Sequence, residues 1–156
     1  MRVHICAVGR LRKGPERDLI DDYLARFDRT GRPLALGPSH VHEVDERKAT
    51  TMADQGRALS RLWPDAAITI ALDERGDALS SRDLAHYLAT TRDGGASDLA
   101  FVIGGADGLE PGLRDAAHKR LSFGAMVWPH MLVRVMLAEQ LYRAATILSG
   151  SPYHRD

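Results

Sequence analysis

Short runs of apolar and β-branched residues recur along the chain and predict buried strands. Three of these runs are continuous: RVHICAV (2–8), AAITIAL (66–72) and DLAFVI (98–103). Unbroken runs of this length are typical of strands that are covered on both faces, as in a parallel sheet. Two further stretches are less regular. We expect residues 34–44 to form a strand interrupted at Gly37-Pro38, and residues 121–128 to form either a strand or a loop.

Segments with the apolar spacing of amphipathic helices lie between these strands. We expect helices over 15–31 and 49–63, from Ser80, from Pro111, and from Pro129 to about Ser149. Proline suits the first turn of a helix, and Ser80 with Asp83 three residues later is close to a capping box. The charged stretch 73–79, DERGDAL, is expected to form a turn. Strands that alternate with helices predict a single α/β domain over residues 1–156, built around a mainly parallel sheet.

The last helical segment is apolar on more than one face. Its large apolar residues are Leu132, Val133, Val135, Met136, Leu137, Leu141, Ile147 and Leu148. A helix buried on two sides in so small a protein suggests that a second subunit covers one of them. The same segment carries Arg134, Glu139 and Arg143, and ionised groups in such a setting need partners. Glu139 and Arg143 are four residues apart and can pair with each other.

The composition is that of an ordinary soluble protein, with 27% charged and 44% hydrophobic residues. The formal net charge is zero. This argues against a protein that simply coats nucleic acid, because such binding draws on many phosphate contacts. The single cysteine, Cys6, lies in an apolar run and is expected to be a small core residue, which fits a reducing compartment. No secretory signal or membrane-length apolar run is evident, so we expect a cytoplasmic protein.

A glycine-rich segment, GGADGLEPG (104–112), follows the third buried strand. Open α/β sheets bind ligands at the carboxyl ends of their strands, and glycine lets the backbone approach a ligand closely. The spacing G-G-x-x-G after a late strand does not match the dinucleotide-binding fingerprint, so a nicotinamide cofactor is not expected. An ordinary tight turn is the alternative.

The segment FGAMVWPH (123–130) combines small and apolar residues just before the last helix. Backbone amides at such a place can clasp an apolar ring similar to adenine. A segment of the hydrophobic core would have the same composition, so both interpretations stand.

The segment GRLRKGP (9–15) is close to a phosphate-binding loop, but Pro15 and Glu16 stand where the motif requires Lys and Ser or Thr. We therefore exclude a nucleoside triphosphatase of this type. Arg10, Arg12 and Lys13 remain as a compact basic loop. It either binds RNA phosphates or is simply exposed to solvent.

The segment HVHE (40–43) places two imidazoles on one face of a strand beside a carboxylate. Metal sites can have this pattern. No other cluster of possible metal ligands lies at a sequence spacing typical of metal sites. A half-exposed strand is therefore the preferred interpretation, and no metal is expected.

Four segments together resemble a known family. They are LDERG (72–76), FVIGGADGL (101–109), LSFGAMVWPHMLVRVMLAEQLYRA (121–144) and SPYHR (151–155). They are similar to the ribosomal RNA large subunit methyltransferase H family, which are small SPOUT methyltransferases that methylate N3 of a pseudouridine in 23S ribosomal RNA. The resemblance covers essentially the whole chain, and the last third is its most specific part.

The resemblance implies a SPOUT-type fold, with a mainly parallel sheet, helices on both faces and a C-terminal segment threaded into a deep trefoil knot. It also implies a homodimer that binds S-adenosyl-L-methionine in the knot. Carried over by position, the cofactor contacts are Leu72, Gly104, Gly105, Phe123, Gly124, Ala125, Met126, Val127 and Trp128. Trp128 departs from the family, which usually has a smaller or aliphatic residue there.

The C-terminal tail supplies the candidate catalytic groups. Methylation of N3 requires loss of its proton, so a base and a cation near the uracil oxygens both help. His154 is the candidate proton acceptor, because an imidazole ordinarily titrates near neutrality. Arg155 or Arg143 is the candidate cation, and Tyr153 can stack on the target base or hydrogen-bond to it.

The neutral net charge suggests that naked RNA binds poorly, and hence that the substrate is 23S ribosomal RNA within the assembled ribosome. Two alternatives remain open. One is a SPOUT methyltransferase that acts on transfer RNA. The other is a non-catalytic dimer that binds S-adenosylmethionine and associates with the ribosome.

Overall fold

Five strands form one sheet, in the order β2-β1-β4-β3-β5, in this computed structural model, which describes residues 1–154. The strands are β1 (Arg2–Val8), β2 (Ser39–Val44), β3 (Ile68–Ala78), β4 (Asp98–Ile103) and β5 (Lys119–Ser122). All four ladders between neighbouring strands are parallel. The predicted α/β architecture is confirmed. Because all strands run the same way, their carboxyl ends lie at one edge of the sheet.

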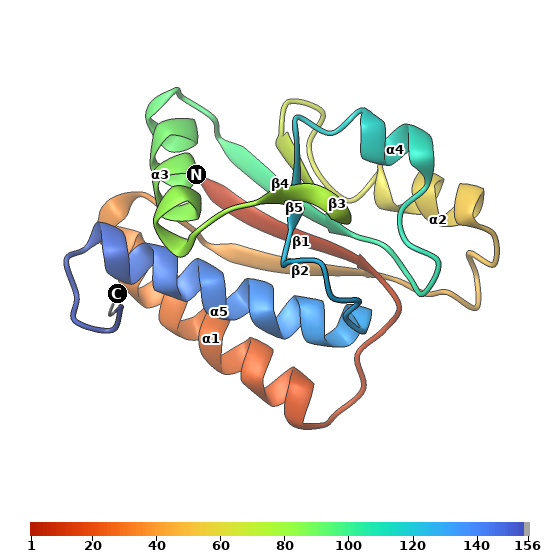
Figure 1. Cartoon of the computed structure of the whole chain (residues 1–156), viewed down its shortest axis with the longest axis horizontal. Coiled ribbons are helices and arrows are strands. Elements are labelled where there is room, and N and C mark those ends of the chain that lie inside the picture. The colour runs from red at the N-terminus through yellow and green to blue at the C-terminus, as the bar shows by residue number, and fades with distance from the viewer. Residues whose placement is uncertain (155–156) are drawn as a thin grey trace.

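Helices cover both faces of this sheet (Figure 1). They are α1 (Pro15–Gly31), α2 (Met52–Leu59), α3 (Ser81–Asp93), α4 (Pro111–Asp115) and α5 (His130–Leu148), with a short 3-10 helix, η1 (Arg32–Leu34), after α1. The larger core lies between the sheet and α1, α3 and α5. A smaller core lies on the other face, where Leu59 of α2 and Leu113 of α4 pack. No helix within residues 1–154 is long and apolar enough to cross a membrane. The trefoil knot stays a prediction.

The helix starts follow the predicted capping chemistry. Ser80 and Asp83 form a complete capping box at α3, in which Ser80 Oγ accepts from Asp83 N at 3.1 Å. The predicted helix over 49–63 is shorter, Met52–Leu59. It begins there because the Thr51 side chain caps it by accepting from Asp54 N at 3.1 Å.

The expectation of a turn over 73–79 is wrong. Strand β3 runs through this charged stretch to Ala78, and its register on β5 shifts between Leu72 and Asp77. The strand persists because β5 supplies backbone partners beyond the irregularity. Gly76 allows the close approach, since a Cβ there would lie 2.8 Å from the backbone of Leu121. Local composition carries no sign of this pairing with a distant segment.

Three histidines meet on the face of the sheet opposite α1 and α5. His4 Nδ1 lies 3.1 Å from His42 Nε2, and the His40 ring stacks on His4 with centroids 5.5 Å apart. The other His4 nitrogen lies 2.8 Å from Asp98 Oδ1, and Arg2 forms a two-point ion pair with the same carboxylate. No group of three or more His, Cys, Asp or Glu residues within 1–154 is arranged to hold a metal ion.

This cluster makes stability depend on pH. Burial, and then the neighbouring His4 and His40, lower the pKa of His42 below its ordinary value of 6.5. As the pH falls below 6.5, the unfolded chain binds a proton at His42 more readily than the folded chain does. The free energy of unfolding therefore decreases as the pH decreases. We expect His42→Gln to lose less stability than the parent protein between pH 7 and pH 5, measured by urea denaturation. His86→Gln, at an exposed position on α3, is the matched control. Equal losses in the parent and in His42→Gln would contradict this account.

Candidate active site

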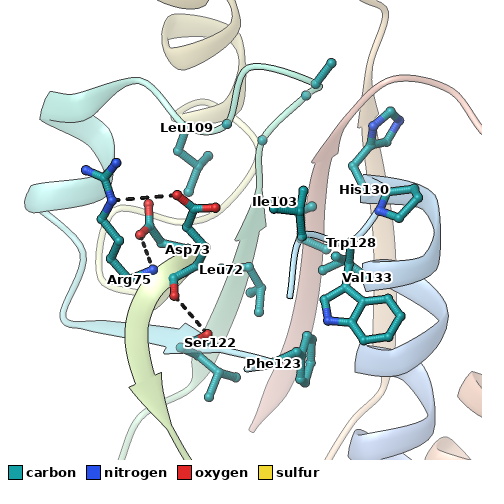
Figure 2. A pocket seen from close by; sticks show the side chains of 18 of the residues that line it. Leu72, Asp73, Arg75, Ile103, Leu109, Ser122, Phe123, Trp128, His130 and Val133 are labelled. Atoms are coloured by element: carbon teal, nitrogen blue, oxygen red, sulfur yellow. Dashed lines mark hydrogen bonds and ion pairs between the residues drawn. The ribbon is translucent and has the colours of Figure 1, made fainter. Parts of the chain in front are cut away.

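A cavity of about 770 Å³ opens at the carboxyl ends of β4 and β5 and beside the middle of β3 (Figure 2). The predicted residues that line it are Leu72, Gly104, Gly105, Phe123, Gly124, Met126, Val127 and Trp128. Ala125 is exposed on the same loop and is not part of the lining. The structure thus brings the glycine turn, the middle of β3 and the loop before α5 around one space, although they are far apart in the sequence.

One side of this cavity is apolar. Ile103, Leu121 and Phe123 contribute side chains from the strand ends, and Val133 contributes one from the first turns of α5 (Figure 2). Sequence reasoning missed Val133 and its neighbour His130. His130 is one residue and Val133 four residues after Pro129, at the start of the predicted helix. This position could have indicated them, because the first turns of a helix can face the same space as the loop that precedes it.

Charged side chains also line the cavity. Asp73 and Arg75 lie on the side away from Val133 (Figure 2), and Asp107 and Arg114 are further lining residues. Asp73 accepts from the Arg75 backbone N at 2.8 Å, and its second oxygen lies 4.0 Å from Arg114 Nη1. A hydrogen bond with Asp115 raises the pKa of Arg114, which stays cationic. The cavity therefore suits a ligand with an apolar ring and a charged end.

The glycine turn has little space for side chains. A Cβ on Gly104 would lie 2.6 Å from Leu109 N and closer still to the Gly108 carbonyl group. Gly108 has φ of +85° and donates from its backbone N to Gly105 O at 3.1 Å. The turn thus needs glycine both for the close backbone approach and for the left-handed conformation.

The loop between β5 and α5 is held at its base and open beyond it. The Ser122 hydroxyl accepts from Gly124 N at 3.1 Å and lies 3.1 Å from Glu74 O. Met126 and Val127 are 69% and 83% exposed. Large apolar side chains are rarely so exposed without a contact, so this loop is a candidate for covering by a ligand or a second subunit.

The tail residues gather at the far end of α5. Arg143 Nε donates to Glu139 Oε1 at 3.0 Å, which confirms the predicted pair, and Tyr153 Oη donates to the same oxygen at 3.1 Å. Arg143 Nη1 lies 3.4 Å from His154 Nδ1. Burial, and then the hydrogen bond with Glu139, raise the pKa of Tyr153 to about 12. Arg155 lies outside the described residues.

The cavity and the tail cluster occupy opposite ends of α5, because His130 at its start lines the cavity and Arg143 near its end contacts His154. Figure 1 shows the course of this helix. His130 lines the cavity, and Arg143 is thirteen residues further along, about 20 Å at the rise of an α-helix. One chain therefore does not bring its own predicted cofactor residues and its own tail residues together.

Comparison with known proteins places this architecture in a family. A family model described as "Predicted SPOUT methyltransferase" matches residues 1–154. The chain belongs to the SPOUT methyltransferase family.

The relatives of this SPOUT chain match it from end to end. Proteins described as "Ribosomal RNA large subunit methyltransferase H" are 63% identical to it in Ruegeria sp. (strain TM1040) and 64% identical in Dinoroseobacter shibae, each over 155 residues and 99% of both chains. The Roseobacter denitrificans protein of that description is 62% identical over 156 residues, which is all of both chains. A solved structure, "a probable methylase family protein from Haemophilus influenzae Rd KW20", aligns with a TM-score of 0.54 at 13% identity, covering 99% of this chain and 70% of that chain. This last match supports the fold alone.

The glycine turn yields a stability prediction. We expect Gly104→Ala to lower the free energy of unfolding by about 1–3 kcal/mol, because the new Cβ must displace the backbone at Gly108 and Leu109. Gly14→Ala is the control, since its Cβ would make an ordinary contact 3.5 Å from Glu16 Oε2. Chemical denaturation measures both, and equal effects at the two positions would show that the turn can relax.

Proposed function

We propose that this methyltransferase transfers a methyl group from S-adenosyl-L-methionine to N3 of a pseudouridine in 23S ribosomal RNA, on the assembled ribosome and in the cytoplasm. The observation that carries the proposal is the cavity at the strand ends, lined by the glycine turn and the loop before α5, in a chain more than 60% identical to the named relatives. We also propose that it works as a homodimer and as a single domain.

The cavity fits the proposed cofactor in size and in chemistry. Its apolar side, formed in part by Ile103, Phe123 and Val133, suits an adenine ring. Its charged side carries both acids and arginines, which suits the ammonium and carboxylate groups of a methionine moiety. When bound, S-adenosylmethionine supplies an electrophilic methyl group. The chain's own part is to fix its orientation through the loop at 123–128 and the turn at Gly104 and Gly105.

The tail groups suit the acceptor side of the reaction. His154 is the proposed acceptor of the N3 proton, and Arg143, kept charged by Glu139, is the proposed partner of the oxygen that gains negative charge. Arg155 is a second candidate for this role. Tyr153 packs against Tyr142 with ring centroids 4.6 Å apart, and its ring lies under Arg143. We expect it to orient the target base or Arg143.

The separation of cavity and tail supports the homodimer. Methyl transfer requires donor and acceptor groups in contact, yet about 20 Å of helix lies between the two sets within one chain. A second copy packed antiparallel on α5 would bring its tail to this cavity. Met131 and Leu132, both about two-fifths exposed at the start of α5, offer an apolar surface for that contact.

The experiment that tests the function is methyl transfer from labelled S-adenosylmethionine. The substrates are ribosomes from a strain lacking this gene, their separated large subunits, naked ribosomal RNA and bulk transfer RNA. We expect label in 23S RNA when intact ribosomes are supplied and little on naked RNA. Label in transfer RNA would show that the substrate is transfer RNA and not 23S RNA. Binding of S-adenosylmethionine without methyl transfer to any of these substrates would indicate a non-catalytic binding protein.

A second prediction concerns the tail. Deleting residues 153–156 should abolish transfer and leave the affinity for S-adenosylmethionine nearly unchanged, as measured by calorimetry. Loss of cofactor affinity to the same degree would show that the tail belongs to the cofactor pocket instead.

Complementation tests whether each site is shared. Co-expression of the tail-deleted chain with a Gly104→Ala chain forms mixed dimers, in which an intact cavity faces an intact tail. Each variant alone should be inactive, and the mixture should regain a fraction of parent activity. A mixture as inactive as its parts, with mixed dimers shown by affinity tags, would mean that each chain builds its own site.

A further inference from the structure

Two loops lie side by side at the carboxyl ends of β1 and β2. One covers residues 9–14 and leads into α1, and the other covers residues 45–51 and leads into α2. The loops are joined where Gly9 N donates to Val44 O at 2.9 Å. Together they carry five exposed cations: Arg10, Arg12, Lys13, Arg47 and Lys48. We call this surface the basic edge.

One carboxylate beneath the basic edge is already paired with cations of that edge. Asp45, whose side chain is only 9% exposed, is bound by Arg47 at 3.0 Å and lies 3.8 Å from Arg10. Hydrogen bonds from Arg47 lower the pKa of Asp45 to about 2. One buried carboxylate is thus shared by two arginines, so it cannot neutralise both.

The remaining cations of these loops are unpaired within the part of the chain that the structure describes. Arg12, Lys13 and Lys48 form no ion pair with any residue in 1–154. Glu46 is the other acid within these two loops, and it likewise forms no ion pair within residues 1–154. The cations outnumber the unpaired acids, so the edge keeps a positive field in a chain with no net charge.

A buried arginine holds the first loop in place. Arg134 of α5, 2% exposed, donates to the carbonyl oxygen of Gly9 at 2.8 Å and also to that of Val8. Its guanidinium also pairs with Glu43 at 3.1 Å, and the same Glu43 oxygen accepts from Leu11 N at 3.0 Å. Burying such a group is costly unless it is paired, and here its partners are the last carbonyl group of β1, the first of the loop and a carboxylate of β2. The start of the loop is therefore held against α5 and β2.

The basic edge begins at the mouth of the cavity. A Cβ on Gly9 would lie 3.4 Å from His130 Nε2, and His130 lines the cavity. Both loops also leave the sheet at the same edge as the cavity, because the strands are parallel. A polynucleotide with one base at the cavity would therefore pass its backbone close to this surface.

We propose that the basic edge binds backbone phosphates of the RNA that flank the target nucleotide. This deepens the proposed function and rests on it. Arginine and lysine side chains on an anchored loop contact phosphates without reading the sequence, so they contribute position and affinity rather than choice of base. Part of the unpaired positive charge of this neutral chain thereby lies beside the place where the substrate enters.

The test removes two cations that hold nothing else in place. Arg12→Ala with Lys13→Ala should raise the KM for ribosomes several-fold, with kcat and the affinity for S-adenosylmethionine unchanged. A plot of the logarithm of the binding constant against the logarithm of the salt concentration should become less steep, by about one unit of slope for each phosphate that the variant no longer binds. Arg12→Lys, which keeps the charge, should stay close to the parent protein.

The matched control removes two other unpaired cations. Arg32 and Arg61 are exposed and form no ion pair within residues 1–154, and they follow the carboxyl ends of α1 and α2, outside the two loops of the basic edge. Arg32→Ala with Arg61→Ala should leave both the KM and the salt slope at parent values. An equal change in this control would show that only total charge matters and would overturn the proposal.

Two other results would also overturn it. An unchanged KM and salt slope in the Arg12 and Lys13 variant would mean that the edge binds no phosphate. A fall in cofactor affinity or in kcat would mean that the loop shapes the cavity instead. Cosedimentation with ribosomes gives a readout that does not need turnover, so failure of the basic edge is distinguishable from an enzyme that transfers no methyl group at all.

Discussion

The guanidinium of Arg134 joins more distant parts of this protein than any other side chain described above. It lies on α5 and is almost fully buried. It donates to the carbonyl groups of Val8 and Gly9 at the end of β1 and pairs with Glu43 of β2. Desolvation lowers the pKa of Arg134, so the charge is kept only because these acceptors surround it. The contact therefore ties the first half of α5 to the carboxyl ends of β1 and β2, while apolar packing holds the rest of the helix.

The position of α5 decides what each end of the helix can do. Its first turns place His130 and Val133 against the cavity, and its last turns hold Arg143 beside Tyr153 and His154. A straight helix cannot bring its own ends together. Under the proposed function, the distance between them requires two chains for one reaction. This also gives a reason for the two apolar sides of α5, one of which packs in the larger core while Met131 and Leu132 remain exposed.

Charge is distributed in this protein by pairing rather than by composition. Most arginines are bound to a neighbouring carboxylate, as in the pairs formed by Arg2, Arg26 and Arg143. Arg12, Lys13 and Lys48, which form no ion pair within residues 1–154, lie on two adjoining loops. A net charge of zero thus conceals a local excess at one edge of the sheet, and the proposed RNA contact draws on this excess.

The elements set by local chemistry could be predicted from the sequence. Continuous apolar runs gave β1 and β4 their bounds, and Ser80 with Asp83 started α3 because a cap needs only neighbours in the chain. The predicted residues around the cavity also came together, apart from Ala125, since the ends of parallel strands meet at one edge. The continuation of β3 past Leu72 could not be foreseen, because its stabilising partner is β5, some fifty residues away along the chain.

By itself, then, the sequence determined which segments are strands and helices, where the caps lie and which residue types are available for chemistry. These features depend on contacts between residues near one another along the chain. Only the tertiary structure decided that Arg134 anchors the 9–14 loop, that Glu139 joins Tyr153 to Arg143, and that the cavity and the tail lie at opposite ends of α5. The reason is that burial, ion pairing and close backbone approach depend on how distant segments pack together, and the order of residues along the chain does not contain those distances.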